Sequence, residues 1–321
     1  MLTSPERWEQ DFAVVDANKP FGLMGKFIEE LPGGLEKDSD LALYQAAYQA
    51  SGYKMWLDKV VVKFWENEEF VKYYKLTRDL GDGLIVLSAD EYDIVNKAKE
   101  LILANEYAVG YFINDDPVNV ELMHQVDIYF NYHVGWDHDL RGVPDYDSNY
   151  MVVESCKALL DGVRINHLNK TIEPFDLKTT RSVYDFPSSF LQYGYYRQCA
   201  FYLHALKTVQ SPVRKYIDEG YTFLPFVFLA VENKKSASHP VIIYETTDWD
   251  VHYGTHGGIV KGKKYKGFME LMEDYQYHKR TGYWDLPVDL IKSKGRIKLN
   301  VFDGSTEESE LYSSDVKPAQ D

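Results

Sequence analysis

The chain has 321 residues, of which 45% are hydrophobic, and a formal net charge of −15. Its length suits one large α/β domain or two smaller ones with a full core, and its charge argues against a protein that coats nucleic acid by charge alone. With only Cys156 and Cys199, sites that are held by four thiolates are excluded.

No membrane segment is predicted, because no apolar run approaches the ~20 residues of a membrane span. No signal peptide is predicted either, because the N-terminal sequence has no basic region followed by an apolar one. We therefore expect a cytoplasmic protein with no membrane partner. The sequence also lacks the glycine-rich lysine motif of P-loop ATPases and the G-x-S-x-G turn of serine hydrolases.

Residues 1–84 are predicted to form an N-terminal helical region. Within it, residues 38–76 show apolar side chains at three- and four-residue spacing, behind Asp38 or Ser39 as a helix cap. The sequence "SGYK" at 51–54 divides this stretch into two helices. A further helix follows Ser88, where a glutamate three residues on completes a capping-box pattern.

From residue 118 the hydrophobic period changes to two, which indicates strands. We predict successive strands at 118–133, 140–147 ("LRGVPDYD") and 171–180 ("TIEPFDLKTT"). Residues 148–170 between the last two are interpreted as a hairpin or a short helical insertion. 

A helix is predicted at 187–209, followed by strands at 221–232 and 239–247. Residues 261–284 begin as a basic loop and become a helix, and 301–321 form an acidic, disordered tail. The whole is an α/β fold with a mixed central sheet flanked by helices, within a core at residues 85–300.

Acidic residues end two of these strands. Asp145 lies near the end of one, while Asp176 and Lys178 share a face of the next. Neighbouring carboxylates repel each other unless a cation or proton lies between them, and oxygen ligands favour Mg²⁺ or Mn²⁺. A lysine there could activate water for phosphodiester hydrolysis. An isolated D-x-K is, however, more often an ordinary charged strand end.

The next helix adds a polar pair. Gln198 and Tyr202 are four residues apart and so share a helix face. They could hold the lysine or a nucleotide, although such a pair alone is more often a half-buried helix edge.

Taken in order, the stretches "RGVPDYD", "FDLKTT" and "YGYYRQCAFYL" resemble the PD-(D/E)XK nuclease superfamily. Within it, the chain is most similar to RecB-like and exodeoxyribonuclease VIII (RecE)-like phage nucleases. The resemblance covers roughly residues 85–290 and implies a restriction-endonuclease-like core. It also implies a Mg²⁺ or Mn²⁺ site with the following residues: Asp145 and Asp176 as metal-binding aspartates, the Leu177 carbonyl as a further ligand, Lys178 as the catalytic lysine, and Gln198 and Tyr202 as the family's Q-x-x-x-Y pair.

The chain departs from that pattern at two points. The family usually has an upstream histidine or glutamate at the metal, but no histidine precedes His124. Glu121 or Gln125 lies nearest the expected position, and the earlier helix offers glutamates as well: Glu91, Glu100 and Glu106. The spacing from Asp145 to Asp176 is also unusually long, which leaves Asp147 as an alternative to Asp145.

Basic residues beside the motifs are the candidate DNA contacts: Arg141, Arg181 and Arg197. The cluster "KGKKYK" at 261–266 is a second candidate, or else a solvated basic loop. Asp137 and Asp139 could bind a metal–nucleotide but are more often part of a solvated turn.

By resemblance, the expected activity is Mg²⁺-dependent exonucleolytic digestion of double-stranded DNA in phage-type recombination or repair. The resemblance also implies a ring-shaped homo-oligomer, a single-strand annealing protein as partner, and the host cytoplasm if the chain is phage-encoded. The alternatives are a structure-specific or single-strand endonuclease, and a DNA-binding or scaffold protein that keeps the fold without cleaving.

Overall fold

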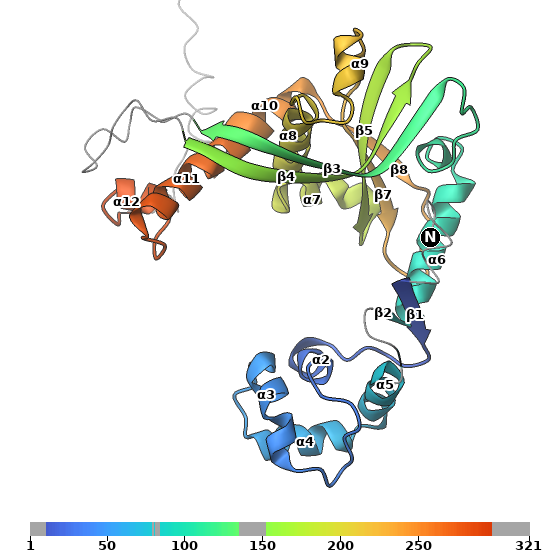
Figure 1. Cartoon of the computed structure of the whole chain (residues 1–321), viewed down its shortest axis with the longest axis vertical. Helices are drawn as coiled ribbons and strands as arrows, with labels where there is room; N and C mark the ends of the chain where they lie inside the picture. Colours follow the sequence, from blue (N-terminus) through green and yellow to red (C-terminus); the bar gives the residue numbers. More distant parts are fainter. Residues whose placement is uncertain (1–10, 79, 81–83, 135–151, 297–321) are drawn as a thin grey trace, which may run out of the picture. The chain divides into compact units, whose positions relative to one another are not determined.

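The computed structural model describes residues 11–78, 80, 84–134 and 152–296 (Figure 1). The chain divides into two compact units, each formed from several segments. Unit 1 comprises Met1–Val118, Leu177–Phe186 and Leu229–Ile243. Unit 2 comprises Asn119–Asp176, Pro187–Phe228 and Tyr244–Asp321.

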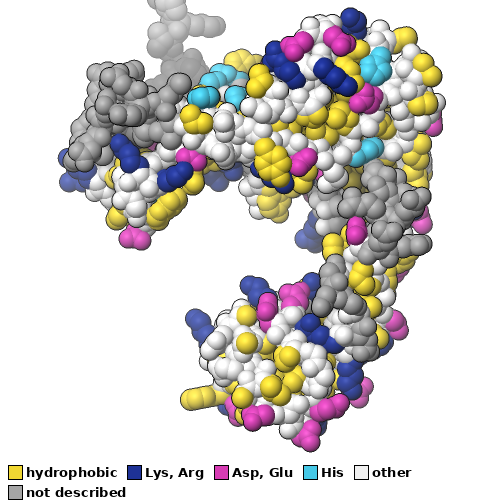
Figure 2. Space-filling model, in the orientation of Figure 1, with side chains coloured by type: hydrophobic (Ala, Val, Ile, Leu, Met, Phe, Trp, Pro, Cys, Tyr) yellow, Lys and Arg dark blue, Asp and Glu magenta, His cyan; other side chains and the backbone are white. Residues whose placement is uncertain are grey.

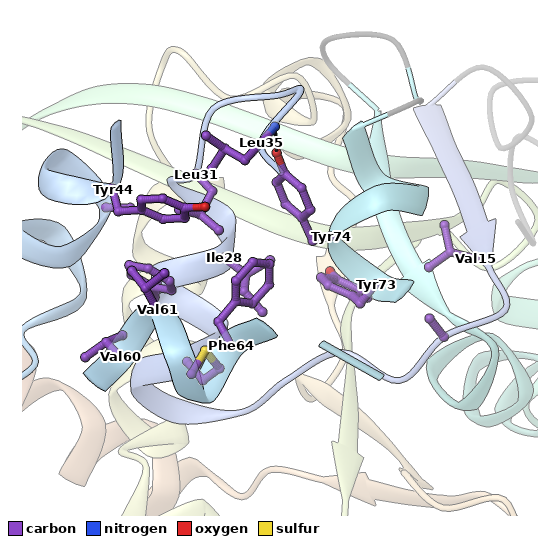
Figure 3. Packing of buried hydrophobic residues seen from close by; sticks show 14 residues of the cluster. Val15, Ile28, Leu31, Leu35, Tyr44, Val60, Val61, Phe64, Tyr73 and Tyr74 are labelled. Atoms are coloured by element: carbon purple, nitrogen blue, oxygen red, sulfur yellow. Dashed lines mark hydrogen bonds between the residues drawn. The ribbon is translucent and has the colours of Figure 1, made fainter. Parts of the chain in front are cut away.

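The N-terminal part of unit 1 is a small helical body. Its helices are α2 (Gly22–Glu29), α3 (Gln45–Ser51), α4 (Leu57–Trp65) and α5 (Glu68–Arg78). Figure 3 shows aromatic and aliphatic side chains of these helices meeting in one core. Phe27 contacts Tyr44, Tyr53 and Phe64 through its ring, and the Tyr74 hydroxyl accepts a hydrogen bond from the Leu35 amide at 3.0 Å. Helices therefore occur between Gly22 and Arg78, inside the stretch for which the sequence predicted a helical region.

Two short parallel strands and a longer helix complete this stretch. Strand β1 (Phe12–Val15) pairs with β2 (Ile85–Ser88), and α6 (Ala89–Ala104) follows at once. The predicted capping box is confirmed, because the Ser88 side chain accepts from the Glu91 amide while the Glu91 carboxylate accepts from the Ser88 amide. The chain therefore passes from strand to helix without an intervening loop.

A mixed sheet lies at the centre of the fold, as predicted. Its strands run in the order β3-β4-β5-β7-β8, with β6 also paired to β5. β3 to β5 are antiparallel, while β5 and β6 are parallel. The strand bounds are β3 Val120–Val134, β4 Val152–Asn166, β5 Thr171–Thr180, β6 Thr222–Phe223, β7 Val227–Glu232 and β8 Ile242–Glu245.

Helices flank this sheet. α8 and α11 pack on the β3–β4 pair, where Phe130 meets Phe201 and Tyr132 meets Phe268, and α10 packs on α8. The helix bounds are α7 Phe186–Gln192, α8 Tyr195–Leu206, α9 Arg214–Asp218, α10 Asp248–His256, α11 Phe268–Thr281 and α12 Val288–Lys292. A small hairpin, β9 (Gly258–Val260) and β10 (Lys263–Tyr265), lies between α10 and α11.

Two predicted elements differ in detail from the structure. The stretch at 148–170 contributes β4, a long strand that forms a hairpin with β5, and not a small insertion. The single helix expected at 187–209 is two helices, since Gly194 adopts a φ of 73° between α7 and α8. The predicted strand at 140–147 and the tail at 301–321 lie outside the described residues.

Candidate active site

Strand β5 carries the D-x-K motif that the sequence singled out. Asp176 is 3% exposed, although the strand continues to the half-buried Lys178 and the exposed Thr179. The strand is held by β4 on one side and by β6 on the other. A carboxylate is rarely buried to this degree without a partner that stabilises its charge, which marks Asp176 as a candidate functional group.

Asp161, on the neighbouring strand β4, is the second carboxylate of this region. The β4–β5 pairing runs from Asn166 and Thr171 to Gly162 and Phe175. Asp161 and Asp176 are each the next residue beyond that last pair. Adjacent strands lie about 4.8 Å apart, so continuing the register beyond this last pair would bring the two carboxylates side by side.

Gly162 allows this close approach. A Cβ atom at this position would collide with the ring of Phe175 and would lie 2.9 Å from the Met123 carbonyl oxygen. The missing side chain therefore leaves room for the Phe175 ring, which is fully buried. The two residues that flank the candidate carboxylates are thus fixed by packing as well as by backbone pairing.

Helix α8 contributes the predicted polar pair. The Gln198 side-chain amide donates to the Tyr202 hydroxyl at 3.0 Å, so the two residues share a helix face as expected. Burial raises the pKa of Tyr202, and the charges of Asp176 and Asp161 raise it further. That common influence shows that both carboxylates lie within electrostatic reach of this phenol. The structure thus brings Asp161, Asp176 and the Gln198–Tyr202 pair together.

Tyr195, one turn before Gln198, lies on the same side. Burial raises the pKa of Tyr195, and Tyr193 and Asp176 add to the effect. Its ring also stacks on Phe228 of β7, with centroids 5.9 Å apart. Tyr195 and Tyr202 therefore both lie within electrostatic reach of Asp176, whose burial strengthens such interactions.

An amide from β3 approaches Asp161. Gln125 adopts a φ of 51°, and the β3–β4 ladder is interrupted at this residue. Its side-chain nitrogen lies 3.5 Å from Asp161 Oδ1. Positive φ is uncommon outside glycine and marks a local distortion that turns a side chain to a new direction. Of the two upstream polar residues considered from the sequence, Gln125 is the one at this site.

The structure does not bring Glu121 to Asp176. Its carboxylate accepts a hydrogen bond from the Tyr216 hydroxyl and lies 3.7 Å from His167 Nε2. Glu121 pairs with Ile165, which pairs in turn with Ile172, four residues before Asp176 on β5. Four residues of strand span about 13 Å, so the expected contribution of Glu121 to a shared metal site is not supported by its position.

The other predicted aspartates cannot be placed. Asp145 and the alternative Asp147 lie outside the described residues, as do Asp137 and Asp139. Among the residues that the structure describes, no group of three or more histidine, cysteine, aspartate or glutamate side chains could hold a metal ion. The donors present, Asp161 and Asp176, are nevertheless hard oxygen ligands of the kind that Mg²⁺ and Mn²⁺ prefer.

The sequence prediction missed Asp161 because it interpreted residues 148–170 as a hairpin or a short helical insertion, and not as one long strand. The overlooked signal was the alternation in "VVESCKALLDGV", in which Glu154, Ala158 and Leu160 are buried while Val153, Ser155 and Lys157 are exposed. Such alternation indicates a strand that is covered on one face. Once β4 is recognised, Asp161 is the carboxylate that faces the D-x-K strand.

The candidate DNA contacts fall in different places. Arg141 lies outside the described residues, and Arg181 is exposed just after β5. The Arg197 guanidinium donates to the Tyr196 hydroxyl at 2.9 Å and lies over the Tyr196 ring. That contact directs Arg197 toward Lys266, whose carbonyl oxygen is 3.4 Å away.

At two of the four lysines of the basic cluster at 261–266, ion pairs offset the positive charge. Lys264 pairs with Glu270 at 3.0 Å, and Lys266 lies 2.6 Å from Asp274 and 2.8 Å from Asp289. On the face drawn in Figure 2, acidic and basic side chains are likewise interspersed. Ion pairs of this kind leave little positive charge for phosphate contacts.

No protein-family model matches the chain, and no curated protein matches it. Among solved structures, one that is similar is the crystal structure of a protein from Eubacterium rectale that is provisionally named an exonuclease. It is 13% identical over 99% of this chain and 92% of its own, with a TM-score of 0.32. No helix in the described part of the chain is long and apolar enough to cross a membrane.

Proposed function

We propose that this chain is a metal-dependent nuclease that hydrolyses phosphodiester bonds in DNA. The observation that carries the proposal is the position of Asp161 and Asp176, each one residue beyond the last pair of the β4–β5 ladder, with Lys178 following on β5. Two carboxylates could hold a divalent metal ion, and a lysine beside them could assist the attack of water on a phosphodiester.

In this proposal, Asp161 and Asp176 hold one or two Mg²⁺ or Mn²⁺ ions, together with the main-chain carbonyl of Leu177. When bound, the ion supplies Lewis-acid catalysis, which lowers the pKa of a water molecule and stabilises charge on the phosphate. The cation also offsets the repulsion between the two carboxylates.

The protein's own groups position the reactants. Lys178 lies two residues after Asp176 and therefore leaves the same face of β5, where its ammonium can orient the attacking water or contact a phosphate oxygen. The Tyr202 hydroxyl, held by Gln198, can position a phosphate oxygen or the lysine. Because burial and the two carboxylates raise the pKa of Tyr202, its hydroxyl keeps its proton and can donate at neutral pH.

We further propose that the activity is exonucleolytic on double-stranded DNA, in phage-type recombination or repair. A cytoplasmic location, a ring-shaped homo-oligomer and a single-strand annealing partner belong to the same proposal. The chain is acidic overall, so an assembly that turns its basic residues toward an inner channel would reconcile that charge with DNA binding.

Incubation with linear and circular DNA, in Mg²⁺ and in EDTA, tests the proposal. Loss of linear DNA alone indicates an exonuclease, whereas nicking or cutting of circular DNA indicates an endonuclease. Lys178→Ala is expected to abolish cleavage while leaving the circular dichroism spectrum unchanged. Absence of cleavage by the parent chain in both Mg²⁺ and Mn²⁺, or normal cleavage by Lys178→Ala, would overturn it.

A further inference from the structure

A buried carboxylate lies at the end of β7, outside the site described above. Glu232 is 1% exposed and belongs to unit 1, as does Lys178. Its Oε1 atom lies 3.1 Å from Lys234 Nζ and 2.9 Å from His239 Nδ1. Its Oε2 atom is also buried and has no hydrogen-bond partner among the described residues. A buried carboxylate oxygen without a partner lowers the stability of the fold, which favours a role for Glu232 other than stability.

The charge state of this group follows from its partners. Burial by itself would raise the pKa of Glu232, but the hydrogen bonds from His239 and Lys234 outweigh it and lower that pKa. Glu232 is therefore ionised at neutral pH, and Nδ1 of the imidazole donates to it. A carboxylate that fixes one imidazole nitrogen sets the orientation of the ring and leaves the other nitrogen for a second partner.

The outer side of this cluster is open to solvent. The His239 side chain is 45% exposed, and Tyr184, which is 61% exposed, meets it edge to face with ring centroids 5.2 Å apart. Because Nδ1 faces Glu232, Nε2 on the far side of the ring points away from the carboxylate. The charged and titratable groups in contact with His239 or its partner are Glu232, Lys234 and Tyr184.

The backbone places the Glu232 cluster at the end of the strand next to the one that carries Lys178. The Asn233 amide donates to the Thr180 carbonyl oxygen at 2.9 Å, and β5 and β7 are neighbours in the sheet. Thr222 pairs with Thr171 at the start of β5 and Asn233 bonds to Thr180 at its end, so β7 runs in the same direction as β5. In a parallel pair, this bond sets Glu232 beside Thr180, two residues beyond Lys178. Side chains two residues apart leave the same face of a strand, so Lys178 and Glu232 lie on the same face of the sheet.

We propose that Tyr184, His239 and Lys234 form a subsite for one nucleotide of a single-stranded DNA segment that extends from the reacting phosphate. Nε2 of the imidazole, with Lys234, contacts a backbone phosphate oxygen, while the exposed Tyr184 ring stacks against the base. This inference rests on the proposed nuclease function, since it assigns the substrate at the same sheet face.

General chemistry supports each part of the assignment. A cationic imidazole or ammonium forms charge-assisted hydrogen bonds with phosphate oxygens. An exposed aromatic ring gives a stacking surface for any base, worth about 1–3 kcal/mol per base in single-strand binding. A cluster that only stabilised the fold would leave DNA affinity unchanged when these exposed groups are replaced.

The test measures binding of a fluorescently labelled single-stranded oligonucleotide by anisotropy, in EDTA to prevent metal-dependent cleavage. Tyr184→Ala is expected to weaken binding by about 5- to 100-fold, while Tyr184→Phe, which keeps the ring, stays within about twofold of the parent. His239→Gln, which removes the imidazole nitrogen that faces the phosphate, is expected to weaken binding relative to the parent. Both side chains are exposed, so a melting curve of each variant confirms an intact fold.

A parallel cleavage assay of the parent in Mg²⁺ separates the two proposals. Cleavage by the parent together with equal affinities for all the variants would overturn the subsite and leave the nuclease. Losses of affinity as described, without any cleavage by the parent, would support the subsite as a DNA-binding site and overturn the nuclease. A parent chain that neither binds nor cleaves would overturn both.

Discussion

Asp161 and Asp176 lie on adjacent antiparallel strands, each one residue beyond the Gly162–Phe175 pair. Both carboxylates raise the pKa of the same phenol, that of Tyr202 on the covering helix α8. This arrangement, rather than either aspartate alone, is what a metal site would use, because single carboxylates at strand ends are common and adjacent ones repel each other.

Replacing Asp161 should therefore remove activity selectively. Asp161→Asn keeps the shape of the side chain but removes its charge, so we expect cleavage of linear DNA in Mg²⁺ to fall by at least about a hundredfold, since even groups that only support metal ligands are worth 10–100-fold. Glu121→Gln is the matched control, because Glu121 contacts Tyr216 and His167 instead. Equal losses in the two variants would refute the assignment of Asp161.

Cation binding should be visible without catalysis. A divalent ion at 100 times its dissociation constant raises the free energy of unfolding by about 2.7 kcal/mol if it binds only the folded state. We expect Mg²⁺ or Mn²⁺ to raise the melting temperature of the parent chain, and Asp176→Asn to abolish that increase. In EDTA, Asp176→Asn should destabilise the fold less than the replacement of another buried polar residue does. The reason is that it removes one of two neighbouring carboxylate charges, which repel each other. An unchanged metal-dependent shift in Asp176→Asn would place the ion elsewhere.

We expect any side chain at position 162 to collide with the ring of Phe175. Gly162→Ala brings a Cβ atom into the Phe175 ring and is expected to destabilise the fold by about 1–3 kcal/mol in urea denaturation. Shortening the ring in Gly162→Ala/Phe175→Leu should restore part of the loss relative to the sum of the single changes. Strict additivity of the two changes would show that the ring and the glycine do not interact. Gly33→Ala, with nothing within 4 Å of the added atom and no positive φ, is the control.

The Glu154–Lys279 ion pair should make stability depend on pH. The Lys279 ammonium lies 2.6 Å from Glu154 and lowers the pKa of that carboxyl in the folded protein. A lowered folded-state pKa contributes stability above the unfolded-state pKa and loses it as the pH falls through the folded value. Lys279→Met should therefore be destabilising at pH 7, with a difference from the parent that shrinks below about pH 4.

The matched control for that ion pair is Lys97→Met. Lys97 pairs with Glu100 at an exposed position on α6, where an ion pair is worth little. Urea denaturation of both variants across the acidic range provides the comparison. A difference for Lys279→Met that stays constant from pH 7 to about pH 3 would contradict the role of the ion pair.

The sequence predicted the elements whose hydrophobic period is local and unambiguous. The capping box at Ser88 and the shared face of Gln198 and Tyr202 depend only on spacing within one helix, and both are confirmed. Strand β5 was also predicted with its observed bounds, because turn residues and a clear alternation delimit it.

The partner of Asp176 could not be found in the same way. Which carboxylate lies beside it depends on strand register, and register is set by long-range packing such as that of Phe175 over Gly162. The distortion at Gln125 is equally invisible in the sequence, since glutamine carries no signal for positive φ. The Glu232–His239 contact joins residues whose pairing depends on the loop after β7.

The hairpin between β4 and β5 also bears on how the site is assembled during folding. Its two strands are joined by residues 167–170 alone, so Asp161 and Asp176 meet through a contact that is short-range in the chain. The parallel pairing of β5 with β6, by contrast, joins residues separated by the whole of α7, α8 and α9. Loop closure favours the shorter contact, and the hairpin is therefore expected to form first. The two carboxylates would then come together before the helices that bury them are in place, while the surrounding salt solution still screens their repulsion.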